Sequence, residues 1–259
     1  MTSIDNLVVV SVVSHGHGPL LRVVLQDLAQ HCARRALHVE ITLNVDEDYS
    51  INPEFYPFSV AMHRNAQPKG FGANHNAAFH RVRGGYFCVL NPDVRLTSDP
   101  FVLISRLGEG IGIVAPQVLS LTGNIQPTAR HLPTPWRIAG RLLGIPPKDY
   151  DMASGVVSPD WVGGMFMLFT HAAYKAVNGF DERFFMYYED VDLCARLRLL
   201  GYAVQVDPAV TVIHDGAYAS HRNWRHFRWH VTSMARFFLS GTYARARHLK
   251  NKLPLPKKA

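Results

Sequence analysis

Along the first ninety positions, short unbroken runs of hydrophobic residues alternate with segments whose hydrophobic residues recur at helical spacing. The run LVVVSVV (7–13) predicts a buried strand, and apolar residues from Leu20 to Leu28 then recur at the spacing of one helix face. Runs at 38–45, 58–63 and 86–90 predict three more strands, with a helix at 73–82. Strands that alternate with helices indicate an open, mainly parallel α/β sheet with ligand sites at the strands' carboxyl ends.

The pattern is less regular beyond position 90. A helix is expected after Asp99, then a strand at 111–120 and a turn at Thr122-Gly123-Asn124. Residues 126–160 are rich in Pro, Gly and Arg, and we interpret them as a long excursion over the active face that forms part of a substrate pocket. The remaining predicted elements are a strand at 161–169, helices at 171–177 and 189–201, and strands at 203–207 and 210–214.

Composition places the chain among ordinary globular proteins. It has 259 residues, of which 47% are hydrophobic and 18% charged, enough for one large domain with an appendage. The net charge of +7 is uneven, because residues 221–259 hold ten Lys or Arg and no acid. We therefore expect a domain at 1–220 and a basic extension at 221–259.

The N-terminus and the cysteines bear on cellular location. The chain starts without a basic leader, and its first apolar run is too short for a signal peptide core or a membrane span. Cys32, Cys88 and Cys194 are odd in number and fall within expected strands or helices, which favours reduced core thiols over disulfides or a zinc site. Both features predict a cytoplasmic protein.

The first candidate for chemistry is Asn91-Pro92-Asp93, which ends the strand at 86–90. Proline interrupts the strand ladder, so Asp93 is presented just beyond the strand's carboxyl end. A carboxylate there could bind a divalent cation, since Mg²⁺ is commonly held by one or two carboxylates with phosphate and water oxygens. A simple turn is the competing interpretation.

The second candidate is the acidic start of the helix at 189–201. Glu189, Asp190 and Asp192 fall in its first turn, and Leu193, Leu197 and Leu200 form its apolar stripe. Acids favour helix N-termini, and Asp192 can pair with Arg196, so capping is one interpretation. The aromatic residues at 184–188 favour another, because partial desolvation beside aromatic surface raises the basicity of a carboxylate and suits it to general-base work.

Weaker candidates are scattered along the chain. His214 ends a strand and is a metal ligand or a core histidine. Gly70 and Gly72 precede a helix, where backbone amides could approach a ligand, and Lys69 could face phosphate or solvent. Asp46 follows the second strand and could accept hydrogen bonds from a nucleoside, although an exposed loop also explains it.

Taken in order, these segments resemble a known family. The segments are VVVSVVSHGHG, LNVDED, RNAQPKGFGANHN, YFCVLNPDVRL, GGMFMLF…GFDERFFMYYEDVDLCARL and PAVTVIH. This series is similar to the inverting family 2 glycosyltransferases of GT-A fold, most of all to their rhamnosyltransferase-like branch. The likeness covers about residues 7–220. It implies a single Rossmann-like domain of GT-A type, with residues 221–259 as a basic amphipathic helical extension.

The resemblance also implies roles for particular residues. Asp93 stands where the family's DXD-type motif holds Mg²⁺ or Mn²⁺ against the donor diphosphate, and His214 matches a histidine that completes this site. Asp190 matches the catalytic base, with Glu189 as second candidate. The donor-binding positions implied are Ser14, His15, Asp46, Lys69, Gly70, Gly72, Asn91, Gly163 and Gly164. The chain departs from the family's usual pattern at three places. It has SHGHG where T-Y-N is usual and VDED where D-N-x-S is usual, and its N-P-D has one carboxylate where D-X-D has two.

The implied function is metal-dependent, inverting hexosyl transfer. The donor would be a nucleotide diphosphate sugar, with L-rhamnose from dTDP-rhamnose as the single choice. The acceptor would be a hydroxyl of a glycan or polyprenyl-linked glycan in bacterial surface polysaccharide synthesis, such as O-antigen. Two other classes stay open: a nucleotidyltransferase acting on sugar phosphates, and a non-enzymatic nucleic-acid binder that uses the basic tail.

The basic extension predicts an amphipathic helix. An apolar stripe recurs at helical spacing and consists of Trp224, Phe227, Val231, Met234 and Phe238. The arginines lie mostly off this stripe. The stripe could pack on the catalytic domain, or it could lie on an anionic membrane surface, with 244–259 supplying further positive charge. The second interpretation makes the protein peripheral on the inner face of the cell membrane.

Overall fold

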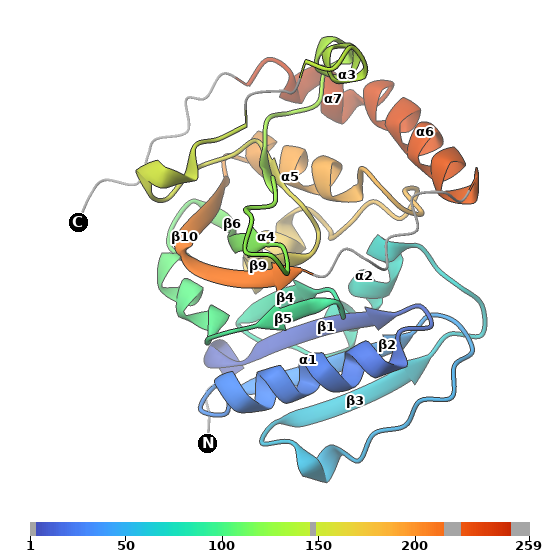
Figure 1. Ribbon diagram of the computed structural model, residues 1–259, viewed down its shortest axis with the longest axis vertical. Helices are drawn as coiled ribbons and strands as arrows, with labels where there is room; N and C mark the ends of the chain where they lie inside the picture. The colour runs from blue at the N-terminus through green and yellow to red at the C-terminus, as the bar shows by residue number, and fades with distance from the viewer. Residues whose placement is uncertain (1–3, 146–148, 215–223, 250–259) are drawn as a thin grey trace.

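The computed structural model describes residues 4–145, 149–214 and 224–249 (Figure 1). The strands of its main sheet are Val8–Ser14 (β1), Leu37–Leu43 (β2), Ser59–Arg64 (β3), Tyr86–Leu90 (β4), Val94–Leu96 (β5), Ile111–Leu119 (β6), Phe166–Thr170 (β9) and Ala203–His214 (β10). They lie in the order β3-β2-β1-β4-β9-β6-β10-β5. A small second sheet pairs Ala129–Arg130 (β7) with Trp161–Val162 (β8).

The main sheet is mixed but mostly parallel. Strands β3, β2, β1 and β4 run parallel to one another, as do β6 and β10. Strand β9 is antiparallel to both β4 and β6, and β5 is antiparallel to β10. The α/β architecture predicted from the alternating pattern is confirmed.

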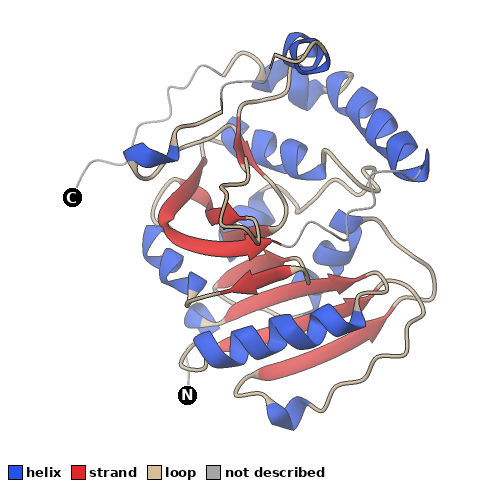
Figure 2. Ribbon diagram, in the orientation of Figure 1, coloured by secondary structure: helices blue, strands red, loops and turns tan. Residues whose placement is uncertain are grey.

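Helices cover both faces of this sheet (Figure 2). Helix α1 and the 3-10 helix η3 pack on one face, and α2, α4 and α5 pack on the other. No described helix is both long and apolar enough to span a bilayer. The α-helices are Gly18–His31 (α1), Phe71–Arg81 (α2), Pro135–Leu142 (α3), His171–Ala176 (α4), Glu189–Leu199 (α5), Trp224–Phe238 (α6) and Gly241–Ala246 (α7), and the 3-10 helices are Ile4–Asn6 (η1), Pro53–Phe55 (η2), Pro100–Arg106 (η3) and Met152–Ser154 (η4).

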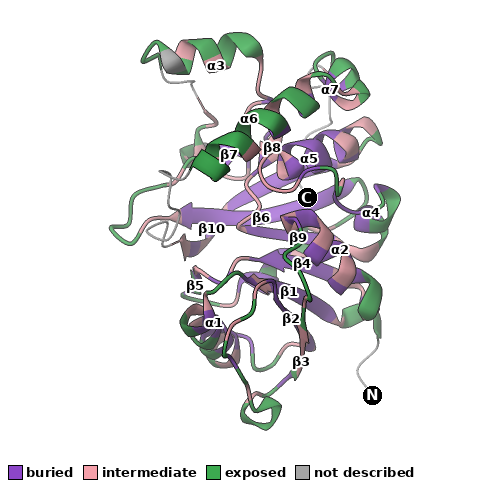
Figure 3. Ribbon diagram, turned by 90° about the vertical axis from the view of Figure 1, so that its right-hand side faces the viewer, coloured by how far each residue is buried: buried purple, intermediate pink, exposed green. Residues whose placement is uncertain are grey.

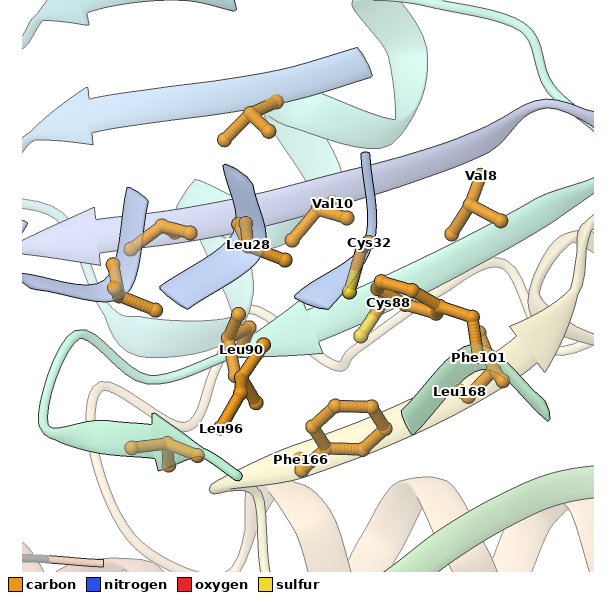
Figure 4. Packing of buried hydrophobic residues seen from close by; sticks show 14 of the residues in the cluster. Val8, Val10, Leu28, Cys32, Cys88, Leu90, Leu96, Phe101, Phe166 and Leu168 are labelled. Atoms are coloured by element: carbon orange, nitrogen blue, oxygen red, sulfur yellow. The ribbon is translucent and has the colours of Figure 1, made fainter. Parts of the chain in front are cut away.

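The cysteines belong to the core. Strand β1 sends alternate valines to opposite faces, so Val8 and Val10 pack under α1 while Val9 packs on the α2 side. Cys32 and Cys88 lie among the first group, close to Leu28 and Leu90 (Figure 4). All three cysteines are buried and free of disulfides, as predicted.

Several predicted elements differ in detail from the structure. The helix after Asp99 is a 3-10 helix, and the segment 161–169 is two strands separated at Gly163-Gly164. Residues 203–214 form one strand, whose pairing with β6 shifts register after Asp207, because Pro208 has no N–H for the ladder. Leu200 is 57% exposed, since α5 ends at Leu199 before the stripe can continue.

Helix α6 presents a different face to the domain from the one its apolar stripe predicted. Trp224, Phe227 and Val231 are 76%, 58% and 38% exposed, whereas Ser233 and Phe237 are buried. Much of α6 and α3 is exposed at one end of the molecule (Figure 3). The prediction that the stripe packs on the catalytic domain is therefore wrong for these three residues. Arg222 and the tail at 250–259 lie outside the described residues.

Candidate active site

Asp93 and His214 come together at the carboxyl ends of β4 and β10. Strand β5 follows Asp93 directly and pairs with β10, with Val94 opposite His214. The His214 Nε2 lies 3.3 Å from Asp93 Oδ2. The other carboxylate oxygen of Asp93, Oδ1, is buried and has no hydrogen-bond partner. A buried carboxylate oxygen without a partner is costly unless a cation or proton donor meets it.

The orientation of His214 adds to this argument. Gln126 uses its Nε2 to donate to the His214 carbonyl at 3.1 Å, which turns its Oε1 towards His214 Nδ1 at 3.0 Å. Nδ1–H is then the donor, so Nε2 of a neutral ring faces Asp93 with a lone pair. Two acceptors face each other, and a proton or a cation must lie between them. A second partner that fixes the tautomer is usual for metal-binding histidines.

The donor set fits a divalent cation that is completed by substrate. No cluster of three or more His, Cys, Asp or Glu able to hold a metal occurs in the part of the chain that the structure describes. One carboxylate and one imidazole would hold a free ion weakly. Mg²⁺ and Mn²⁺ suit this arrangement, since phosphate and water oxygens can fill the remaining positions.

Asp190 has the properties of a general base. Its Oδ1 accepts from the Val191 amide at 2.8 Å and its Oδ2 from the Gly164 amide at 3.2 Å, so two hydrogen bonds fix the carboxylate. Burial raises the pKa of Asp190 to about 6, although the backbone hydrogen bonds act in the opposite direction. Such a carboxylate is ionised at neutral pH and more basic than an exposed one.

The neighbouring acids have different surroundings. Burial, followed by the charge of Asp190, raises the pKa of Glu189 well above its usual value, and its Oε2 has no partner. Asp192 forms an ion pair with Arg196 at 2.6 Å, which is the structural role that its spacing predicted. Of the three acids, Asp190 best fits the general base expected from the resemblance, and that role stays a prediction.

A short backbone segment connects the two parts of the site. Gly164 donates its amide to Asp190, and the next residue, Met165, accepts the Asn91 amide at 2.9 Å. Asn91 and Asp93 belong to the same turn after β4. The candidate base and the candidate metal ligand are thus held on either side of Gly164-Met165, which explains how residues a hundred positions apart keep a fixed relation.

The loop before Asp190 has an unusual backbone. Tyr187 and Tyr188 have φ angles of 70° and 66°, a region that non-glycine residues adopt at a cost of about 1–3 kcal/mol each. Helix α6 holds this loop: Ser233 Oγ donates to the Met186 carbonyl at 2.8 Å, and the Tyr187 hydroxyl lies 3.0 Å from His226 Nδ1. The helix therefore stabilises the backbone that presents Asp190.

The expected nucleotide-binding residues gather at the ends of β1 and β2. Ser14 is buried and its Oγ accepts the His17 amide at 2.9 Å, whereas His15, Asp46 and Lys69 are exposed. Desolvation, followed by the positive neighbours His17 and Arg225, lowers the pKa of His15. These positions are available to a ligand, and their assignment to the donor stays a prediction.

Sequence reasoning missed an asparagine network that supports this region. Asn44 accepts the Lys69 amide at 2.8 Å and donates to the Lys69 carbonyl at 2.9 Å. Asn65 donates to both Asn44 and Asn74, at 2.9 and 2.7 Å. The available signal was an asparagine directly after each of β2 and β3, where a parallel sheet gathers polar groups.

The glycines of the site allow close packing. A Cβ on Gly70 would lie 2.9 Å from backbone atoms of Phe185, and a Cβ on Gly72 would lie 2.4 Å from the Phe180 Cβ. A Cβ on Gly164 would lie 3.2 Å from the Phe71 ring and one on Gly163 would lie 2.8 Å from the Met165 Cε. Packing alone accounts for Gly70 and Gly72, so their contact with a donor also remains a prediction.

A cavity of about 610 Å³ opens beside Asp190. Its walls come from the excursion at 126–160, as predicted, and from α6, which sequence reasoning did not place there. The cationic residues Arg130, Arg137 and Arg141 were also missed. Its lining includes Arg130, Arg137, Arg141, Tyr188, Asp190 and Phe227.

Comparisons with known proteins show likeness to glycosyltransferases. A family model described as the N-terminal domain of galactosyltransferase matches residues 155–217, which contain the Gly163-Gly164 segment and α5. The rhamnosyltransferase WbbL of Escherichia coli is 29% identical over 95% of this chain and 96% of its own length. The N-acetylglucosaminyl-diphospho-decaprenol L-rhamnosyltransferase of Mycobacterium tuberculosis is 28% identical over 52% of this chain and 48% of its own length.

Solved structures share the fold. The mannosyltransferase PcManGT of Pyrobaculum calidifontis, solved with GDP-Man and Mn²⁺, superposes with a TM-score of 0.60 at 15% identity, over 95% of this chain and 65% of that one. TarS of S. aureus superposes with a TM-score of 0.59 at 13% identity, over 92% of this chain and 68% of that one. The chain thus spans about two thirds of each of these two structures.

The fold and the relatives define the chain as a glycosyltransferase with the GT-A fold. Its rhamnosyltransferase relatives confirm the resemblance to the rhamnosyltransferase-like branch of family 2, and they support a role in glycan synthesis. None of the relatives named above is a nucleotidyltransferase or a nucleic-acid binder.

Proposed function

We propose that the protein is a metal-dependent, inverting glycosyltransferase that transfers L-rhamnose from dTDP-rhamnose to a hydroxyl of a lipid-linked glycan in bacterial surface polysaccharide synthesis. The observation that carries the proposal is Asp190, a fixed carboxylate of raised pKa at the wall of a cavity, tied through Gly164-Met165 to the Asn91–Asp93 turn. The names of the relatives support rhamnose as the sugar, and one of them specifies a diphospho-decaprenol acceptor.

The proposed reaction is a single displacement. Asp190 accepts the proton of the acceptor hydroxyl, whose oxygen forms a bond to the anomeric carbon. The bond from that carbon to the diphosphate breaks, and the electron pair leaves with dTDP. Attack occurs on the face opposite the leaving group, so the anomeric configuration inverts. Asp93 and His214 would hold Mg²⁺ or Mn²⁺, which supplies positive charge to the leaving diphosphate.

The donor assignment is tested by calorimetric titration with dTDP-rhamnose, UDP-glucose, UDP-N-acetylglucosamine and GDP-mannose, each with Mn²⁺ and with EDTA. The proposal expects dTDP-rhamnose to bind most tightly of the four donors, and on the order of 10²-fold more tightly with Mn²⁺ than with EDTA. Tighter binding of another donor would replace rhamnose while keeping the transferase site. Failure of all four to bind would contradict the donor site itself.

The raised pKa of Asp190 predicts the pH dependence of the reaction. The base works in its ionised form, so kcat/KM should be constant above about pH 7 and should fall about tenfold per pH unit below about 6. A pH–rate profile with saturating metal measures this. The residual activity of Asp190→Asn should lack the acidic limb, and a wild-type profile that stays flat to about pH 5, with the protein still folded by circular dichroism, would contradict the assignment.

We also propose that the protein binds anionic membrane surfaces. Trp224, Phe227 and Val231 of α6 and Trp136 of α3 are exposed, with arginines beside them, and four more lysines lie in residues 250–259. Such a surface would place a peripheral enzyme near a lipid-linked acceptor.

Vesicle sedimentation tests this second proposal. Binding should require anionic lipid and should weaken in a chain that ends at Leu249. This end point removes four positive charges yet keeps Tyr243 and Ala246, which are buried against α5 and α6. Equal sedimentation with neutral vesicles, or with the shortened chain, would exclude the electrostatic mechanism.

A further inference from the structure

The cavity beside Asp190 is separate from the residues expected to bind the donor. Its lining includes neither Asp93 nor His214, and none of the expected nucleotide-binding residues at the ends of β1 and β2. Of the site residues predicted from sequence, only Glu189 and Asp190 face it. A base that takes a proton from the acceptor must contact the acceptor hydroxyl, whose oxygen lies between that base and the donor's anomeric carbon. The cavity is therefore on the acceptor's side of Asp190.

The three arginines that line the cavity differ in their carboxylate neighbours. Burial and the nearby charge of Arg141 lower the pKa of Arg130, while Asp149 and Asp190 raise it, so both carboxylates act on Arg130. Among the described residues, no Asp or Glu forms an ion pair with Arg137 or Arg141.

The spacing of Arg137 and Arg141 allows both side chains to bind the same ligand. They lie four positions apart on α3, so their side chains leave the same face of the helix, and both line the cavity. Like charges at this spacing destabilise a helix unless an anion neutralises them. Two guanidinium groups side by side can each donate paired hydrogen bonds, which is the geometry that phosphate oxygens accept.

Apolar surface flanks the same cavity. Phe227 of α6 lines it and is 58% exposed, and Trp136 on α3 and Leu143 directly after α3 are 87% and 78% exposed. Figures 1 and 3 both place α3 and α6 together at one end of the molecule. The cavity and its rim thus combine a candidate base, two arginines and exposed apolar residues, which match in kind the sugar, diphosphate and lipid chain of one acceptor.

We infer that Arg137 and Arg141 bind the diphosphate of a lipid-diphosphate-linked sugar acceptor and thereby place its hydroxyl at Asp190. This inference rests on the proposed function for the sugar transfer itself, but it assigns an acceptor subsite to α3. The two arginines are positioning residues that do not touch the reacting atoms.

Calorimetric binding of farnesyl diphosphate tests the assignment without any transfer reaction. The variant Arg137→Gln/Arg141→Gln should bind about tenfold or more weakly than wild type, since charge-assisted hydrogen bonds are lost. Arg228→Gln is the matched control, because Arg228 is an exposed arginine of α6 that does not line the cavity. Equal affinities of wild type and double variant would overturn the inference, and so would inorganic diphosphate binding as tightly as farnesyl diphosphate.

A kinetic comparison separates positioning from general damage. With an N-acetylglucosaminyl-diphospho-lipid acceptor the double variant should raise KM about tenfold or more, while KM for a neutral alkyl N-acetylglucosaminide of similar chain length stays unchanged. Equal changes for both acceptors would contradict the subsite. Arginine-dependent farnesyl diphosphate binding in a protein that does not transfer rhamnose would keep the subsite and refute the proposed donor.

Discussion

Replacing Asp190 by asparagine is expected to lower kcat for glycosyl transfer by about 10² or more while leaving donor affinity unchanged. The amide is close to isosteric with the carboxylate, so the contacts with the Val191 and Gly164 amides can be kept through its oxygen. It cannot accept the acceptor's proton. Single-turnover rates and calorimetric donor binding on the same preparation measure the two quantities.

Glu189→Gln is the matched variant for this prediction. Glu189 is buried at the adjacent position, and burial raises the pKa of its carboxyl well above the usual value, so the neutral and nearly isosteric glutamine is a conservative replacement. We expect it to retain most of the transfer rate. Near-normal turnover by Asp190→Asn, or a larger loss in Glu189→Gln, would move the base away from Asp190.

Replacing Asp93 by alanine is expected to remove the metal-dependent part of donor binding, a loss on the order of 10²-fold in affinity with Mn²⁺ present. Only His214 would remain as a protein ligand, and the donor diphosphate could not make up for the lost carboxylate charge. Transfer should fall further than binding, because the charge on the leaving dTDP would no longer be stabilised as it develops.

Asp46→Ala provides the contrast. Asp46 is exposed after β2 and is predicted to contact the nucleoside, so its loss should weaken donor binding by the same factor with Mn²⁺ and with EDTA. Asp93→Ala should instead bind donor with the same affinity in both conditions. If wild type itself binds dTDP-rhamnose equally well in EDTA, the proposed metal dependence is wrong whatever the variants do.

The sequence predicted the parts of the fold that local patterns determine. Unbroken valine and leucine runs identified the buried strands, and Asn91-Pro92-Asp93 marked a strand end because proline cannot continue the ladder. Asp192 could be paired with Arg196 from spacing alone. Asp190 could be separated from Asp192 only by resemblance, since both are acids in the first turn of the same helix.

Long-range contacts limited the rest of the prediction. The face that α6 turns to the domain depends on Ser233 reaching the Met186 carbonyl and on Phe237 filling a gap beside Tyr188, and neither contact follows from the hydrophobic stripe. No local pattern distinguishes Arg137 and Arg141 from other surface arginines, because only the path of residues 126–160 brings α3 to the cavity beside Asp190. The wrong exposure predicted for Leu200 has the same origin, because helix periodicity does not say where tertiary packing stops.

The anomeric configuration of the first product tests the central claim most directly. Purified protein, dTDP-rhamnose, Mn²⁺ and an N-acetylglucosaminyl-diphospho-lipid acceptor would be followed by proton NMR from the start of the reaction. The account predicts a rhamnoside with the configuration opposite to that of the donor, formed together with an equal amount of dTDP. A product that keeps the donor's configuration, or dTDP released without any glycoside, would contradict a single displacement with Asp190 as base.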